Sequence, residues 1–204
     1  IDRWTELLDN KNNRSVQVIF KDFSKAFDRM QPAILLRTLL SMDIPDHIIR
    51  LSLDFLTDRE QRVRVDNSKS DYSAVRVGVP QGTTAGPLFW LAFINTYQPD
   101  FCEHIKYADD ITCFYPLSDD HANHPDTCDV VEYGMNWCKE NSMLLNLQKT
   151  KVMSLTLKQK KAPENPPGGE EVERVNSWKF LGVTIDQTLS FEEHITNITK
   201  KSEQ

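Results

Sequence analysis

The chain has 204 residues, of which 39% are hydrophobic and 26% are charged, and its formal net charge is −6. This length suits one domain or two small ones, and the apolar content excludes a chain that is disordered throughout. The acidic balance is unusual for a nucleic-acid-binding protein, which normally presents a basic surface. It is compatible with such a protein if the acids gather at a metal site and the basic contacts lie on other domains.

The cysteine count and the ends of the chain bear on its compartment. Four cysteines are too few for a disulfide framework and indicate reduced thiols in an intracellular protein. A zinc site would have to use His121, His124, Cys128 and Cys138, but their spacing matches no common ligand pattern, so scattered surface residues are the favoured interpretation. There is no membrane-spanning apolar run, signal peptide or initiator methionine, so we expect a fragment of a longer protein with no membrane partner.

The first predicted elements are a helix and a strand. Residues 1–9 have the pattern of the end of an amphipathic helix, with Trp4, Leu7 and Leu8 on one side. Residues 16–20 are β-branched and aromatic and predict a strand. This strand would deliver Asp22 at or just past its end.

Two helices and a hairpin should follow. Pro32 can open a helix, and a second helix should begin after Pro45. The aliphatic stripes of both helices are interpreted as core: Ile34, Leu35, Leu39 and Leu40 in the first, and Ile48, Ile49, Leu51, Leu53, Phe55 and Leu56 in the second. Residues 62–65 and 74–79 predict two strands of a hairpin, joined by a turn over 66–71.

A loop rich in glycine and proline, residues 78–87, comes next. Gly82 and Gly86 would permit another group to approach the backbone closely. Taken alone, this loop is more simply interpreted as a connection that ends in a helix cap.

Two adjacent aspartates, Asp109 and Asp110, stand between two apolar segments, residues 105–108 and 111–114. These segments predict a hairpin with the carboxylates at its tip. Adjacent carboxylates repel each other and resist desolvation, so they pack poorly. They suit a hard divalent cation such as Mg²⁺. An ordinary turn is the alternative for this stretch alone.

The last third of the chain predicts short elements. Residues 130–141 fit a helix with Val131, Met135 and Trp137 or Cys138 toward a core, and Ser190 suits the N-cap of a final helix. Strands are predicted at the four segments 144–147, 152–157, 172–175 and 179–185, with a flexible basic loop at 158–169.

These elements alternate and include hairpins, which predicts an α+β fold: an antiparallel sheet with helices packed on one face. In such a sheet Asp22, at a strand end, can meet Asp109 and Asp110 at a hairpin tip. Three converging carboxylates are what a two-metal phosphoryl-transfer site requires.

Five segments in this order resemble the successive palm motifs of reverse transcriptases, and are most similar to those of the non-LTR (LINE-type) retrotransposon branch. The segments are Asp22–Asp28, Val79–Thr83, Tyr107–Asp110, Asn146–Thr150 and Phe180–Asp186. The resemblance extends over residues 16–198. It implies the end of the fingers or a connecting helix at 1–15, a polymerase palm at 16–170, a primer-grip-like hairpin at 171–189 and the start of a truncated thumb at 190–204.

The resemblance implies roles at the metal site. Asp22 and Asp109 would ligate two catalytic Mg²⁺ ions directly, with Mn²⁺ as a substitute, and Asp110 would support them more loosely. The backbone carbonyl of Phe23 would be a further ligand. Lys149 would face the pyrophosphate as general acid, with Lys151 as the alternative.

Further roles concern the substrates. Phe27 would lie under the incoming sugar and disfavour a 2′-hydroxyl, or would simply be a core ring. Gln81 and Gly82 would contact the incoming nucleotide and the template. Phe180, Leu181 and Gly182 would grip the primer end, although packing is the simpler interpretation for Leu181 and Val183.

The implied activity is RNA-directed DNA polymerisation, in which a primer 3′-hydroxyl attacks the α-phosphate of a dNTP. The partners would be an RNA template, a DNA primer and dNTP, and the location nuclear. The expected fingers, thumb and endonuclease domains are missing, and the link over 96–104 is short for this branch. A catalytically inactive or domesticated interaction domain is therefore the alternative. A nucleotidyl cyclase is disfavoured, because it would lack the Gln81-Gly82 loop.

Overall fold

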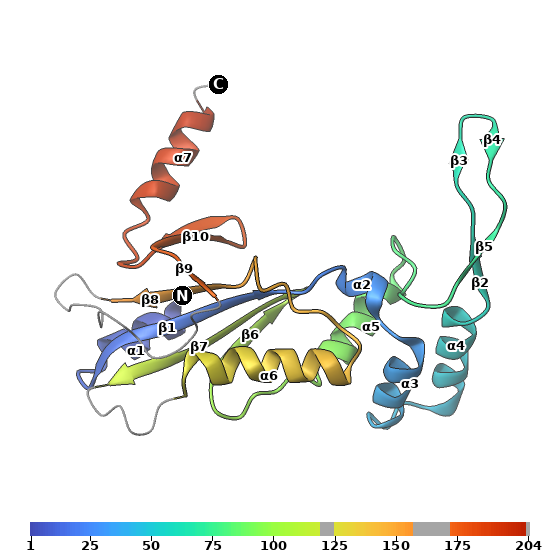
Figure 1. Cartoon of the computed structure of the whole chain (residues 1–204). Coiled ribbons are helices and arrows are strands. Elements are labelled where there is room, and N and C mark those ends of the chain that lie inside the picture. The colour runs from blue at the N-terminus through green and yellow to red at the C-terminus, as the bar shows by residue number, and fades with distance from the viewer. Residues whose placement is uncertain (119–124, 157–171, 203–204) are drawn as a thin grey trace. The chain divides into compact units, whose positions relative to one another are not determined.

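The structure is a computed structural model that describes residues 1–118, 125–156 and 172–202 (Figure 1). The chain divides into two units. The first unit comprises Ile1–Asp22, Pro99–Gly134 and Leu145–Gln204, and the second comprises Phe23–Gln98 and Met135–Leu144. The predicted basic loop at 158–169 and both histidines of the rejected zinc site lie outside the described residues. In the part of the chain that is described, no helix has the length and apolar character needed to cross a membrane.

A five-stranded sheet in the order β6-β7-β1-β8-β9 forms the first unit. Its strands are β1 (Asn13–Asp22), β6 (Glu103–Tyr107), β7 (Asp110–Ser118), β8 (Lys151–Leu155) and β9 (Glu173–Arg174). Every neighbouring pair is antiparallel except β8 and β9, which run parallel. The central strand β1 is hydrogen-bonded on both sides and nearly all buried, as its β-branched and aromatic composition predicts. The predicted α+β fold is confirmed.

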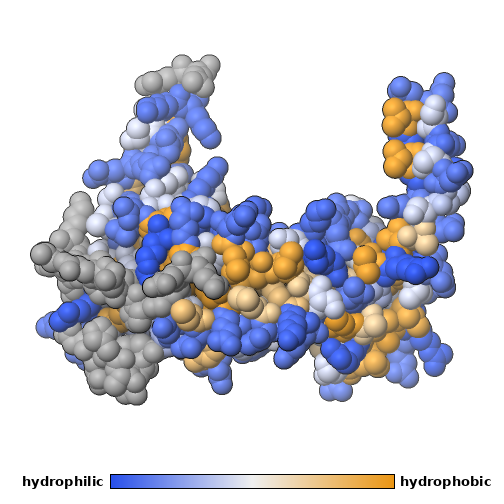
Figure 2. Space-filling model, viewed as in Figure 1, coloured by the Kyte–Doolittle hydropathy of each residue, from blue (hydrophilic) through white to orange (hydrophobic). Residues whose placement is uncertain are grey.

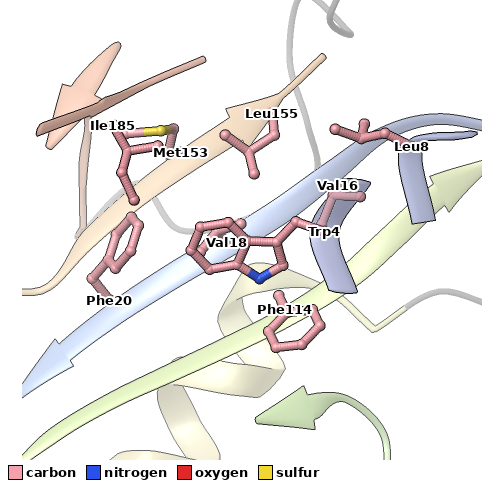
Figure 3. Close-up of a cluster of buried hydrophobic side chains, with 9 residues drawn as sticks. All are labelled: Trp4, Leu8, Val16, Val18, Phe20, Phe114, Met153, Leu155 and Ile185. Atoms are coloured by element: carbon pink, nitrogen blue, oxygen red, sulfur yellow. The ribbon is translucent and has the colours of Figure 1, made fainter. Parts of the chain in front are cut away.

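Different elements cover the two faces of β1. On one face lie α1 (Asp2–Asp9) and a hairpin of β10 (Ser177–Phe180) and β11 (Val183–Asp186). They enclose the apolar cluster of Figure 3, made of Trp4, Leu8, Val16, Val18, Phe20, Phe114, Met153, Leu155 and Ile185.

On the opposite face of β1, Lys21 Nζ donates a 2.7 Å hydrogen bond to the carbonyl of Val130 in α6 (Thr127–Glu140). The prediction of helices on one face therefore holds for α6, while α1 joins the hairpin on the other face. The first unit ends with α7 (Glu192–Ser202).

Helices and a long hairpin make up the second unit. The helices are α2 (Ala26–Arg29), α3 (Pro32–Leu40), α4 (Asp46–Leu56) and α5 (Ala85–Ile94), and the last residues of α6 join them. Aromatic rings fill the centre of this unit: Phe23, Trp90, Phe93, Tyr97 and Trp137. The hairpin pairs β2 (Arg59–Gln61) with β5 (Ser73–Val75), and β3 (Arg64–Val65) with β4 (Ser68–Lys69).

Several boundary and burial predictions are wrong. The helices after Pro32 and Pro45 form, but part of their aliphatic stripes is exposed, namely Leu40, Ile48, Leu51 and Leu53; Met135 is exposed too. Residues 66–71 are not all turn, because the ladder of β3 and β4 continues to residues 65 and 68. The segment 144–147 forms no strand, and 179–185 is interrupted by the turn at Leu181 and Gly182.

Candidate active site

The sheet of the first unit places Asp22 opposite Asp110. Asp22 is the last residue of β1, Asp110 is the first residue of β7, and the two are cross-strand partners. Directly opposite residues point to the same face, with Cβ atoms about 4.5–5.5 Å apart. Tyr107 pairs with Asp110, so Ala108 and Asp109 form the turn between β6 and β7, and Ala108 has φ 52°. The predicted hairpin with carboxylates at its tip is confirmed.

The carboxylates of this edge influence one another. Burial raises the pKa of Asp110, and the negative charges of Asp109 and Asp22 raise that pKa further, while Lys149 lowers it. Asp110 therefore lies in a negative field produced by both other aspartates. A site of this kind favours a cation.

A lysine stands beside Asp22. Lys149 Nζ lies 3.2 Å from Asp22 Oδ2, and 64% of the Lys149 side chain is exposed. The backbone N–H of Asn146 donates a 2.9 Å hydrogen bond to the carbonyl of Asp22, and the carbonyl of Asn146 accepts hydrogen bonds from the N–H groups of Lys149 and Thr150. This loop thereby ties the lysine to the end of β1.

Lys151, the alternative to Lys149, has a different environment. Its side chain is only 9% exposed and forms an ion pair with Glu173 at 2.5 Å. Its Nζ also donates to the carbonyl of Gln148 at 2.6 Å. Lys151 thus joins β8 to β9, and this favours Lys149 as the lysine of the site.

The hairpin of β10 and β11 closes one side of a small hollow of about 100 Å³. The residues lining it include Asp22, Asp110, Lys149, Trp178, Phe180 and Leu181. Leu181 and Gly182 form the hairpin turn with φ values of 47° and 86°. A leucine in the left-handed region is strained, and its side chain is 46% exposed. The packing interpretation is therefore wrong for Leu181 and right for Val183, which packs on the apolar cluster.

The side chains at this edge of the sheet have the chemistry that a hard divalent cation requires. Carboxylate oxygens are the ligands that such cations prefer. Asp22 Oδ2 is shielded from solvent and accepts no hydrogen bond, although Lys149 is its ion-pair partner. Within the described ranges, however, no three His, Cys, Asp or Glu side chains are arranged to hold a metal ion. The structure brings Asp22 and Asp110 together and leaves Asp109 in the turn, so the ligand roles of Asp109 and the Phe23 carbonyl stay predictions.

The remaining predicted residues belong to the second unit. The loop with Gln81 and Gly82 is tied to α2 by two backbone hydrogen bonds, from Val79 N to the Phe27 carbonyl at 3.0 Å and from Gly78 N to the Met30 carbonyl at 2.8 Å.

Three glycines of this loop have different local requirements. A Cβ on Gly78 would lie 3.0 Å from backbone atoms of Phe27 and Asp28, so Gly78, which was not predicted, permits the closest approach of these glycines. Gly82 has φ +74° and open space around it, so its requirement is conformational. A Cβ on Gly86 would lie 3.3 Å from the Pro80 carbonyl oxygen, so the predicted close approach is confirmed at Gly86.

A polar contact that the sequence did not reveal joins the two motifs. Gln81 Nε2 donates a 2.8 Å hydrogen bond to Asp28 Oδ1, and both groups are exposed. Asp28 is the last residue of the first motif, and this position is the only feature of the sequence that points to Asp28. The Phe27 ring is half-buried, with its centroid 5.4 Å from that of Trp90. It is thus neither a fully buried core ring nor free of packing.

A family model described as reverse transcriptase (RNA-dependent DNA polymerase) matches residues 3–185. The chain belongs to the reverse transcriptase family. The domain is 30% identical over 206 residues to the "probable RNA-directed DNA polymerase from transposon BS" of Drosophila melanogaster. That match covers 91% of this chain and 22% of the relative.

A second relative is the "RNA-directed DNA polymerase from mobile element jockey" of the same organism, 26% identical over 88% of this chain and 20% of the relative. This reverse transcriptase domain thus spans about a fifth of the length of its curated relatives.

Solved structures agree with the fold of the reverse transcriptase domain. Apo telomerase from Candida tropicalis, truncated from its C-terminal domain, has a TM-score of 0.66 at 16% identity, covering 93% of this chain and 38% of the telomerase chain. Telomerase from Candida albicans, in complex with a fragment of telomeric RNA, has a TM-score of 0.64 at 13% identity, covering 93% and 32%. At such low identities the likeness shows the fold alone.

Proposed function

We propose that this chain carries the polymerase centre of an RNA-directed DNA polymerase, which extends a DNA primer with deoxynucleotides on an RNA template. The observation that carries the proposal is the pairing of Asp22 with Asp110 at the ends of two hydrogen-bonded strands, in a chain of the reverse transcriptase family. The names of its relatives, which are polymerases of mobile elements, support the assignment.

Asp22 and Asp109 would hold two Mg²⁺ ions, or Mn²⁺ in their place, with Asp110 in support. When bound, such ions neutralise phosphate charge and activate the attacking hydroxyl. The sheet hydrogen bonds fix the Asp22 and Asp110 backbones relative to each other. Fixed carboxylates reduce the free energy needed to reorganise the site.

Lys149 would supply the proton for the leaving pyrophosphate. Its exposed side chain ends beside Asp22, so its ammonium group can reach a phosphate bound at this edge. Lys151 is less suited, because its ammonium group is held between Glu173 and a backbone carbonyl.

The substrate contacts follow the same assignment. Phe27 would discriminate against a 2′-hydroxyl, and the loop of Gln81 and Gly82 would contact nucleotide and template. Phe180, Leu181 and Gly182 would hold the primer end; the exposed, strained turn at Leu181 supports a role other than packing. The nuclear location is also part of the proposal, and imaging of a tagged chain in cells tests it.

Primer extension tests the activity. We expect extension of a DNA primer on an RNA template with Mg²⁺ and dNTPs, once the flanking domains of the longer relatives are supplied. Asp109→Ala should abolish it, whereas the control Asp54→Ala, at an exposed residue of α4, should not. Extension that survives Asp109→Ala would overturn the proposed centre. If the unsubstituted protein does not extend the primer, the result favours the alternative, a catalytically inactive interaction domain.

A further inference from the structure

The long hairpin of the second unit carries a cluster of basic residues. We call residues 59–76 the basic arm; it extends beyond α4 as a narrow two-stranded ribbon (Figure 1). It holds five of the 24 basic residues and three of the 30 acidic residues, so its net charge is +2 in a chain of net charge −6. Its basic residues are Arg59, Arg62, Arg64, Lys69 and Arg76.

Two of these cations oppose each other on the ribbon. Arg64 on β3 is the direct cross-strand partner of Lys69 on β4, and both residues are exposed. Like charges directly opposite in a ladder destabilise it. Among the described residues neither forms an ion pair, and the Arg64 guanidinium donates only to the neutral carbonyl of Asp66, at 3.1 Å. An anion that contacts both cations would remove this cost.

A third cation stands next to this pair in sequence. The Arg62 guanidinium carbon lies 4.7 Å from the centroid of the Tyr72 ring, and Tyr72 is 59% exposed. This cation–π contact holds a planar guanidinium at the surface. Figure 2 shows apolar patches beside hydrophilic residues on the outer arm, where Val63 and Val65 are 66% and 64% exposed.

We propose that the basic arm binds the sugar-phosphate backbone of the nucleic acid that the polymerase centre uses, without reading its sequence. This inference rests on the proposed function. A guanidinium matches two phosphate oxygens at once, and an ammonium adds a point charge. A row of such groups on an exposed ribbon can follow successive phosphates. A protein partner would need a larger apolar surface than two valines, so the charge pattern favours the phosphate backbone.

Binding without dNTP tests the arm separately from catalysis. The probe is a fluorescently labelled DNA primer annealed to an RNA template, and the anisotropy is measured from 50 to 200 mM salt. The arm variant carries Arg62→Gln, Arg64→Gln and Lys69→Gln. A control with the same charge change carries Lys11→Gln, Arg37→Gln and Arg50→Gln, all on exposed residues outside the arm.

Each phosphate that the protein no longer neutralises lowers the salt slope by about 0.9. If the arm variant neutralises two or three fewer phosphates, the affinity ratio of wild type to arm variant should shrink about 10- to 40-fold across this salt range. The control should retain the wild-type slope. Equal slopes for arm variant and control would overturn the proposal, and so would a wild-type chain that does not bind the probe at 50 mM salt.

A variant with Val63→Ser and Val65→Ser tests whether the exposed apolar side chains, and not the charges, hold the probe. The proposal expects this variant to keep the wild-type salt slope. Loss of probe binding there, with none in the charge variant, would overturn the proposal, because the apolar side chains and not the charges would hold the probe. Circular dichroism checks the fold; if the triple variant is unfolded, Arg64→Gln alone should lower the slope by about 0.9. Asp110→Asn should stop extension yet bind the probe, so failure of catalysis and of the arm are separable.

Discussion

Asp186 should stabilise the junction between β11 and α7 through its charge. Its Oδ1 accepts hydrogen bonds from Thr188 N at 2.9 Å, Thr188 Oγ1 at 2.6 Å and Ser190 N at 3.2 Å. Its Oδ2 accepts from Ser190 Oγ and Phe191 N, both at 2.9 Å. Burial acts to raise the pKa of Asp186, but the hydrogen bonds from Thr188 and Ser190 outweigh it and hold that pKa well below its usual range.

The substitution Asp186→Asn tests the two carboxylate oxygens separately, because it keeps one oxygen and replaces the other with an amide nitrogen. The amide oxygen can keep the bonds of Oδ1, but the amide nitrogen cannot accept those of Oδ2, so Phe191 N loses its acceptor. Loss of capping bonds of this kind costs about 1–2 kcal/mol of unfolding free energy. In a chain of this size that corresponds to roughly 2–8 °C in Tm.

The pH dependence has a definite sign. Because the folded pKa is lowered, the stabilisation by the carboxylate is complete above the unfolded pKa of about 3.9. It is lost as pH falls from there toward the folded pKa. Urea unfolding of wild type and Asp186→Asn should therefore show a constant difference between pH 7 and 5 that shrinks below about pH 4. The exposed control Asp54→Asn should unfold like wild type. Equal stability of Asp186→Asn and wild type at pH 7 would refute this reasoning.

Three further outcomes test other residues. Phe27→Ala should raise ribonucleotide incorporation in primer extension by about tenfold or more; unchanged sugar selection would reduce Phe27 to a packing role. Lys149→Ala should lower the extension rate about 10²-fold at unchanged Tm, whereas Lys151→Ala should mainly lower Tm, and the reverse pattern would exchange their roles. Asp28→Asn and Gln81→Ala should show a coupling of about 0.5–1.5 kcal/mol in a double-mutant cycle on nucleotide binding, and additive effects would show that their hydrogen bond does not matter there.

Strand ends and tight turns were the most predictable parts of the site. A β-branched run followed by Asp22, and two apolar runs around Asp109 and Asp110, require only local rules to place the acids at an edge. The cross-strand partnership of Asp22 with Asp110 depends on register, which the sequence does not state. The sequence therefore indicates which acids to consider, while the ranking of Asp109 above Asp110 comes from the resemblance and stays a prediction.

Contacts between distant segments were beyond sequence reasoning. Lys149 and Lys151 are two residues apart and chemically alike, and only the parallel pairing of β8 with β9 gives Lys151 its partner Glu173. The exposed leucines of α4 have the same periodicity as buried ones, because periodicity marks a face and not what covers it. The close approach at Gly78 is not visible in the sequence, because its spatial neighbour Phe27 lies 51 positions earlier in the chain.

The most direct test of the central claim is a double-mutant cycle on primer extension with Asp22→Asn and Asp110→Asn. Residues that act as one unit show strongly non-additive losses. Each single variant should lose extension by on the order of 10³-fold, and the double variant should lose little more. Folding of each variant is checked by Tm. A wild-type extension rate in either single variant, or losses that multiply in the double variant, would contradict the account.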